Sequence, residues 1–94
     1  NAVLIDCLTL WVSNFVLNEI EASLINANAK KLIGALKKMK PDSIIVSNEV
    51  GLGIVPENKL ARDFRDVAGK VNQIVAEGAD EVYFMAAGQP LKLK

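Results

Sequence analysis

The run Ile44-Ile45-Val46-Ser47-Asn48-Glu49-Val50-Gly51-Leu52-Gly53-Ile54-Val55-Pro56 decides the fold, because it changes from an apolar strand into a glycine-containing loop. Three consecutive β-branched residues, 44–46, predict a strand covered on both faces, as in a parallel sheet. Ser47, Asn48 and Glu49 follow at its carboxyl end, where open α/β sheets bind their ligands. The run therefore predicts an α/β fold with a candidate site in this loop.

Helices are predicted on both sides of this run. Thr9 is a candidate N-cap for a helix to about position 17, with four apolar residues available for burial: Leu10, Trp11, Phe15 and Leu17. Over 23–39, apolar residues spaced by four and three form one stripe, and lysines 37, 38 and 40 sit in the last turn, where they complement the helix dipole. The longest helix opens at Pro56, carries Gly69 where we expect close packing, and ends with Gly78 at C′.

Short apolar runs predict the remaining strands. The first covers 2–5 and ends in Asp6, and another covers 81–87. Residues 88–90 form a turn, and the alternating apolar and cationic residues 91–94 suit an edge strand. Strands thus alternate with helices, which predicts an α/β layered fold with a mostly parallel sheet, helices packed on it and a C-terminal edge hairpin.

Composition restricts the partners and the chemistry. The 94 residues contain 11 Lys plus Arg and 11 Asp plus Glu, which argues against nucleic acid or an anionic membrane as a partner. No run reaches the length of a membrane span. Cys7 is the only cysteine, so it cannot form an intrachain disulfide; we expect a small buried residue and a reducing, cytoplasmic location. The absence of histidine excludes any mechanism that takes a histidine from this chain.

Asp6 is the first candidate site residue. An acid at the end of an apolar strand has the shape of the second nucleotide motif of P-loop proteins, where the carboxylate holds Mg²⁺ directly or through water. The structural alternative is that Asp6 caps the following helix.

The loop residues Asn48 and Glu49 are the second candidate. An amide and a carboxylate there could contact a ribose, a base edge or a metal, or they could form a turn that only stabilises the loop. Gly51 and Gly53 permit positive φ or close backbone approach. They match neither the dinucleotide fingerprint nor a phosphate-binding loop, because no Gly-Lys-Ser/Thr occurs in the chain.

Taken together, these motifs resemble one family, the bifunctional adenosylcobinamide kinase/adenosylcobinamide-phosphate guanylyltransferase of cobalamin synthesis. The resemblance covers nearly the whole chain. It rests on the runs Leu4-Ile5-Asp6-Cys7-Leu8-Thr9, Ser47-Asn48-Glu49-Val50-Gly51-Leu52-Gly53-Ile54-Val55-Pro56-Glu57-Asn58, Leu60-Ala61-Arg62, Phe64-Arg65-Asp66, Gly69 and Val71-Asn72-Gln73.

The resemblance implies a RecA-like P-loop fold and two reactions. These are phosphorylation of adenosylcobinamide by a nucleoside triphosphate, and transfer of GMP from GTP to the product through a guanylylated histidine. It also implies Mg²⁺ with GTP or ATP and a homo-oligomer, typically a trimer. Asp6 matches the family acid that contacts the nucleotide, and the polar helix with Arg62, Arg65 and Asn72 is expected at subunit contacts.

The chain departs from this family in what it lacks. The family's P-loop and its histidine precede the matched region, and the connector after Phe15 is shorter. We therefore expect residues 1–94 to be a single α/β segment, the C-terminal part of a larger nucleotide-binding domain, with no catalytic residue and no activity alone. The alternative is a structural or oligomerisation module of that fold. A receiver-like domain ranks third, since its acidic cluster is missing.

Overall fold

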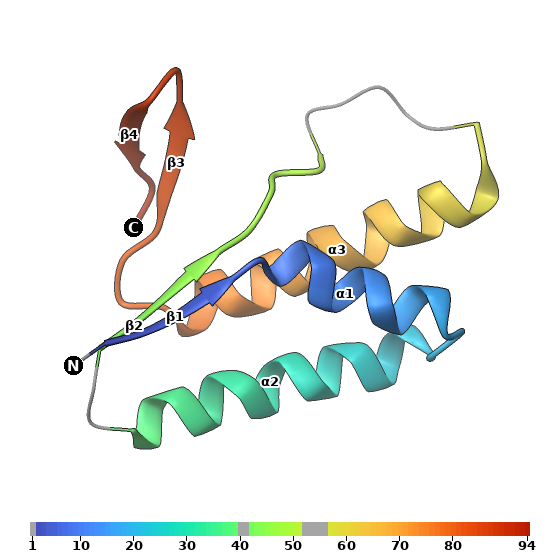
Figure 1. The fold of residues 1–94 in the computed structure, drawn as a ribbon, viewed down its shortest axis with the longest axis horizontal. Helices are drawn as coiled ribbons and strands as arrows, with labels where there is room; N and C mark the ends of the chain where they lie inside the picture. The colour runs from blue at the N-terminus through green and yellow to red at the C-terminus, as the bar shows by residue number, and fades with distance from the viewer. Residues whose placement is uncertain (1, 40–41, 52–56) are drawn as a thin grey trace.

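The computed structural model describes residues 2–39, 42–51 and 57–94. The order of strands and helices matches the prediction and confirms the α/β class. Figure 1 shows the elements, which follow one another as β1 (Ala2–Asp6), α1 (Leu8–Leu17), α2 (Ala22–Lys38), β2 (Asp42–Val46), α3 (Lys59–Gly78), β3 (Tyr83–Ala86) and β4 (Gln89–Lys92).

Strands β1 and β2 form a parallel pair whose register runs from Ala2 opposite Asp42 to Asp6 opposite Val46. The parallel arrangement agrees with the prediction, but the expected cover on both faces is wrong. Leu4 is 65% exposed and Ile44 57% exposed, whereas Ile45 packs against the core. Alternate residues of a strand point to opposite faces, and the helices of this chain cover only one of them.

The core lies among the three helices rather than between helices and a broad sheet. In α1 its residues are Leu8 and Val12, one helical turn apart, and not the predicted Leu10 and Leu17, which are exposed. Because α1 begins at Leu8, its positions 8 and 12 form the stripe that meets the other helices. The other buried apolar residues are Ile25, Ala29, Ala68, Val71, Ile74 and Val75.

Helix α2 follows its predicted stripe except at the end. Ile25 and Ala29 are fully buried, but Met39 is exposed because the helix ends at Lys38. Lysines 37 and 38 occupy the last turn, as predicted, where cations complement the helix dipole. Lys40 lies outside the described residues.

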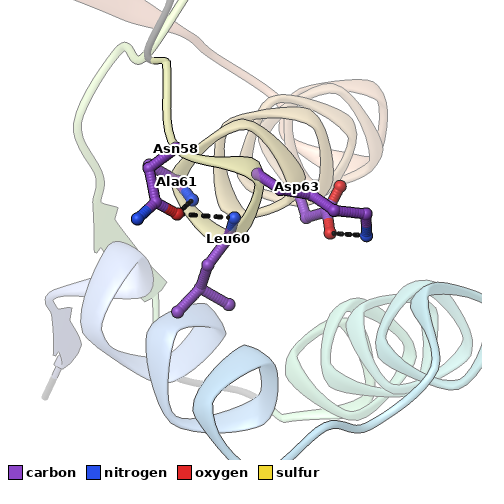
Figure 2. A network of polar contacts seen from close by, with 5 residues as sticks. Asn58, Leu60, Ala61 and Asp63 are labelled. Carbon is purple, nitrogen blue, oxygen red and sulfur yellow. Dashed lines mark hydrogen bonds and ion pairs between the residues drawn. The ribbon is translucent and has the colours of Figure 1, made fainter.

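Helix α3 begins at an N-cap that differs from the predicted start. The side chain of Asn58 accepts hydrogen bonds from the backbone N–H of Leu60 (2.8 Å) and of Ala61 (3.3 Å), as Figure 2 shows. These bonds satisfy amide donors that the first turn of a helix leaves unpaired. Pro56, the predicted first residue, lies outside the described residues. Leu60 is 51% exposed, because the buried residues of this helix begin further along, at Ala68.

Neither glycine of α3 has the role expected of it. A Cβ added at Gly69 would meet nothing within 4 Å, so the close packing predicted there is absent. A Cβ at Gly78 would instead overlap Cγ2 of Ile33 on α2. Gly78 is also the last helical residue rather than a C′ residue, and the C-cap is Ala79 with φ −80°. Gly78 therefore permits the close approach of α2 and α3 at this end.

Strands β3 and β4 form an antiparallel hairpin that closes at Ala87 and Gly88. Their φ values of 51° and 74° are both positive, as a type I′ turn requires, so the turn lies one residue before the predicted 88–90. Pro90 consequently belongs to β4, opposite Met85.

The hairpin is a sheet of its own, which corrects the expectation of one mostly parallel sheet. Within the described ranges, β3 pairs only with β4, and β1 only with β2. Backbone bonds between Val82 and the last two residues extend the pairing of the hairpin beyond β3 and β4. Lys94 anchors the hairpin to α3 by donating to the carbonyls of Ala76 (3.1 Å) and Glu77 (2.9 Å).

Candidate functional site

The candidate site begins where the two parallel strands end together. Asp6 lies opposite Val46, so Asp6 and the segment from Ser47 onward share one edge of the pair. The structure thus brings both predicted candidates to the carboxyl ends of the strands. Asp6 is exposed, and the described residues give its carboxylate no hydrogen bond or ion pair.

Asp6 does not take the structural alternative, which was to cap the next helix. The N-cap of α1 is Cys7, joined to Asp6 by a cis peptide bond, and no side chain caps this helix end. The carboxylate of Asp6 is therefore available to a ligand or a metal ion.

Three polar side chains and the backbone of Asn48 form a ring of hydrogen bonds that holds the turn after β2. The Asn48 N–H donates to Oγ1 of Thr9 (3.0 Å), and Nδ2 of Asn72 donates to the Asn48 carbonyl (2.9 Å). Oγ of Ser47 donates to Oδ1 of Asn72 (2.6 Å), and the hydroxyls of Thr9 and Ser47 lie 3.4 Å apart. Thr9 was predicted to be an N-cap, but the structure places its hydroxyl against this turn instead.

The direction of the fourth hydrogen bond follows from the chemistry of the other three. An amide oxygen only accepts, so the single hydroxyl hydrogen of Ser47 must go to Asn72. Thr9 then has to be the donor between the two hydroxyls. Each of Thr9, Ser47, Asn72 and Asn48 therefore donates once and accepts once, which closes a ring across α1, the turn and α3. We call these four residues the polar ring.

Glu49 and Gly51 continue the turn. Oε1 of Glu49 accepts from the Gly51 N–H (2.7 Å), and Nη2 of Arg65 donates to the Gly51 carbonyl (2.8 Å). Glu49 thus follows the loop-stabilising alternative. The side chain of Asn48, by contrast, makes no hydrogen bond to any described residue. Gly53 lies outside the described residues.

Arg65 and Asn72 are the residues whose role sequence reasoning missed. We expected both at subunit contacts, which stays a prediction, and within the chain each binds the turn. Both are half-buried on the border of the apolar stripe of α3. Their position beside the apolar stripe could have indicated this role, because a polar side chain there can reach a neighbouring loop of the same chain.

Cys7 lies between Asp6 and the polar ring. It is half-buried rather than buried as predicted. A hydrogen bond from the Thr9 side chain, aided by the backbone N–H of Leu10, lowers the pKa of the Cys7 thiol below its ordinary value. Oγ1 of Thr9 accepts from the turn, and its single hydroxyl hydrogen goes to Ser47 while Cys7 is a thiol and to the sulfur once Cys7 is ionised.

Two hollows among the described residues lie away from this edge. The one of about 690 Å³ is lined by the end of α1, its connector to α2 and the first turns of α3, and the one of about 310 Å³ by the later residues of α1 and the start of α3. None of the candidate residues lines either. Across the described ranges no three acidic or cysteine side chains gather to hold a metal. A single carboxylate still fits Mg²⁺, because this ion usually takes one or two carboxylates and completes its shell with water and phosphate oxygens.

None of the helices in the described part of the chain has the length and apolar character needed to cross a bilayer.

Comparison with known proteins identifies the relatives of this chain. The sequence model of the family described as cobinamide kinase / cobinamide phosphate guanyltransferase matches residues 1–93. The chain is 38% identical to the bifunctional adenosylcobalamin biosynthesis protein CobU of Escherichia coli, over 98% of its length. It is 40% identical to CobU of Salmonella typhimurium over its full length, and 39% identical to CobP of Pseudomonas aeruginosa over 98%. It spans between 53% and 59% of the length of these relatives.

Proposed function

Because the chain belongs to the cobinamide kinase / cobinamide phosphate guanyltransferase family, we propose that it forms part of the nucleotide site of such an enzyme. The complete enzyme phosphorylates adenosylcobinamide with GTP or ATP and transfers GMP from GTP to adenosylcobinamide phosphate. The observation that carries this proposal is the meeting of Asp6 and the Ser47–Gly51 turn at the carboxyl ends of two parallel strands. Ligands of open α/β sheets bind at that edge.

In this proposal Asp6 is the residue that binds the metal ion. Its exposed carboxylate, which has no partner among the described residues, would bind Mg²⁺ directly or through water. When bound, the ion neutralises charge on the phosphates of GTP or ATP. The chain's own contribution is to fix the position of that carboxylate at the end of β1.

The chain alone is expected to be inactive. It contains no phosphate-binding Gly-Lys-Ser/Thr motif and no histidine, so it cannot orient a triphosphate for transfer or carry a guanylyl group on histidine. Phosphoryl transfer depends mainly on positioning and electrostatic stabilisation, and the residues here supply only part of either.

A second candidate function is a structural or oligomerisation module. It is favoured by the open face of the β1–β2 pair, where Leu4, Ile44 and Val46 are exposed. Apolar patches of this kind often mark interaction surfaces. In this alternative the chain takes part in assembly, as in the trimer that the family resemblance implies, and binds no nucleotide.

Titration with Mg·GTP distinguishes the two functions. Trp11 packs edge-to-face on Phe15 in α1, a few residues beyond Asp6, and its fluorescence reports on this region. We expect saturable binding that Asp6→Asn abolishes. Asp80→Asn, which changes an exposed aspartate in the turn after α3, is the matched control and should bind like the unaltered chain. Absence of a response from a folded chain would contradict the nucleotide site and support the structural module.

A second experiment tests the enzymatic activity of the chain when the missing N-terminal part is supplied. The N-terminal part of the E. coli relative, joined ahead of this chain, should restore GTP-dependent transfer to adenosylcobinamide phosphate. Asp6→Asn should remove that activity. A folded fusion that lacks activity would contradict the proposed enzyme function.

A further inference from the structure

We propose that Asn72 is the positioning residue for the turn after β2, and that it fixes the Asn48 peptide at the edge where Asp6 lies. This inference rests on the proposed function, because it assigns the turn to the nucleoside side of the same site. Asn72 belongs to the middle of α3, 24 positions from the residue whose carbonyl it binds.

Both polar atoms of the Asn72 side-chain amide form hydrogen bonds with the turn. Oδ1 accepts from the Ser47 hydroxyl at 2.6 Å, while Nδ2 donates to the Asn48 carbonyl at 2.9 Å. On the other side of Asn48, its N–H donates to Thr9. The peptide groups before and after Asn48 are therefore both held, one from α1 and one from α3. The backbone of this residue cannot rotate without breaking the polar ring.

An amide is required at this position for a chemical reason. The turn presents a hydroxyl donor and a carbonyl acceptor to the same side chain, so that side chain must accept and donate at once. Aspartate would keep the acceptor but place a charged oxygen against the Asn48 carbonyl oxygen. In a closed ring each hydrogen bond polarises the next, so loss of one weakens the others.

With the backbone of Asn48 fixed, its side chain is left for a ligand. Among the described residues, the Asn48 side chain has no hydrogen-bonding partner, whereas the Glu49 carboxylate is already bound to Gly51. A free amide offers one acceptor and two donors, which suits a ribose hydroxyl or a base edge better than a phosphate. Asp6 then lies at the phosphates of the nucleotide, and the Asn48 side chain forms hydrogen bonds with its ribose or base.

The substitution Asn72→Asp tests this role because acid reverses it. At neutral pH the new carboxylate repels the Asn48 carbonyl, and we expect the Asn48 amide to exchange its hydrogen about tenfold faster than in the unaltered chain. Near pH 4 the carboxyl group becomes protonated and can donate again, so protection should return. A general loss of folding would not be reversed by acid. The measurement is amide hydrogen exchange by NMR on the full 94-residue chain.

Gln73→Glu is the matched control. Gln73 is the next residue of α3, it is exposed, and the substitution also converts an amide into a carboxylate. It should leave the exchange of the Asn48 amide unchanged at every pH. The charged or titratable groups near the turn are Asp6, Cys7, Glu49 and Arg65. Any effect of their titration on the Asn48 amide appears equally in the exchange rates of the unaltered chain and of Gln73→Glu at each pH.

The same variants are then titrated with Mg·GTP. Asn72→Asp should lower the affinity about tenfold at neutral pH, and Gln73→Glu should not. Unchanged protection of the Asn48 amide in Asn72→Asp overturns the positioning role. Lost protection with unchanged affinity overturns its link to the nucleotide. If the unaltered chain binds no GTP, the proposed nucleotide site fails, while amide exchange still decides whether Asn72 positions the turn.

Discussion

Single side chains replace backbone pairing at the end of β2. Once a strand ends, its next peptide groups lose their ladder partners and need others. Thr9 and Asn72 supply these partners for Asn48, and Arg65 supplies one for Gly51. The turn is therefore shaped by groups from two helices as well as by its own Glu49, which binds the Gly51 N–H.

The thiol of Cys7 provides a pH-dependent test at the scale of one residue. Thr9 lowers the pKa of Cys7 by hydrogen bonding, so Thr9→Val should raise that pKa toward its ordinary value. The thiolate is the nucleophile, and a higher pKa leaves less thiolate at neutral pH. We expect slower alkylation of Cys7 by iodoacetamide at pH 7, with the whole rate profile moved to higher pH.

Thr9→Ser is the control for this measurement, because it keeps the hydroxyl and removes only a methyl group. Its alkylation profile should follow that of the unaltered chain. Identical profiles for Thr9→Val and Thr9→Ser would show that the hydroxyl does not set the pKa of Cys7.

At the scale of elements, α3 connects the parts of the molecule. It packs against both α1 and α2, holds the turn after β2 through Arg65 and Asn72, and accepts the Lys94 ammonium at its last carbonyls. A cation at those carbonyls also complements the helix dipole. Changes in α3 should therefore affect both stability and the candidate site.

The two glycines of α3 give a matched pair of predictions. Gly69→Ala should raise the free energy of unfolding by about 0.5–1 kcal/mol, because alanine favours the helix and its Cβ meets open space. Gly78→Ala should lower it by about 1–3 kcal/mol, because the new Cβ overlaps Ile33, whose β-branched side chain is stiff. Urea unfolding of the two variants measures both changes.

A double substitution identifies the cause of the second effect. In an Ile33→Ala background the overlapping methyl group is gone, so the cost of Gly78→Ala should largely disappear. An equal cost in both backgrounds would assign the effect to the end of α3 itself. A stabilising Gly78→Ala would mean that α2 and α3 are not as close as the structure shows.

At the scale of the whole molecule, one face of the parallel pair is apolar and open. Leu4, Ile44 and Val46 are exposed there, while the opposite face meets the helical core. We expect the chain to associate with itself in a concentration-dependent way, and Ile44→Lys to reduce this association by placing a charge on the face. Sedimentation velocity over a range of concentrations measures it.

Leu17→Lys is the matched control for the open face, because Leu17 is 66% exposed at the far end of α1. It should leave self-association unchanged. A chain that stays monomeric at every concentration, or an equal effect of both lysines, would contradict a role for this face.

The sequence by itself determined the order of the elements and the membership of the family. Three β-branched residues at 44–46 indicated β2, the spacing over 23–39 indicated α2, and the run after Val46 carried the family motif. These features are local, because β-branching, helical spacing and turn residues act over a few neighbouring positions. For the same reason the expected boundaries were off by one to three residues.

Only the tertiary structure decided which side chains build the candidate site. Thr9 looked like a cap and Asn72 like a surface residue, yet they meet the turn after β2 from positions 38 and 25 residues away from Ser47. The register of β1 on β2 and the packing of α3 bring these groups within hydrogen-bonding distance. Such distances depend on how all the elements pack together, and no local pattern in the sequence contains them.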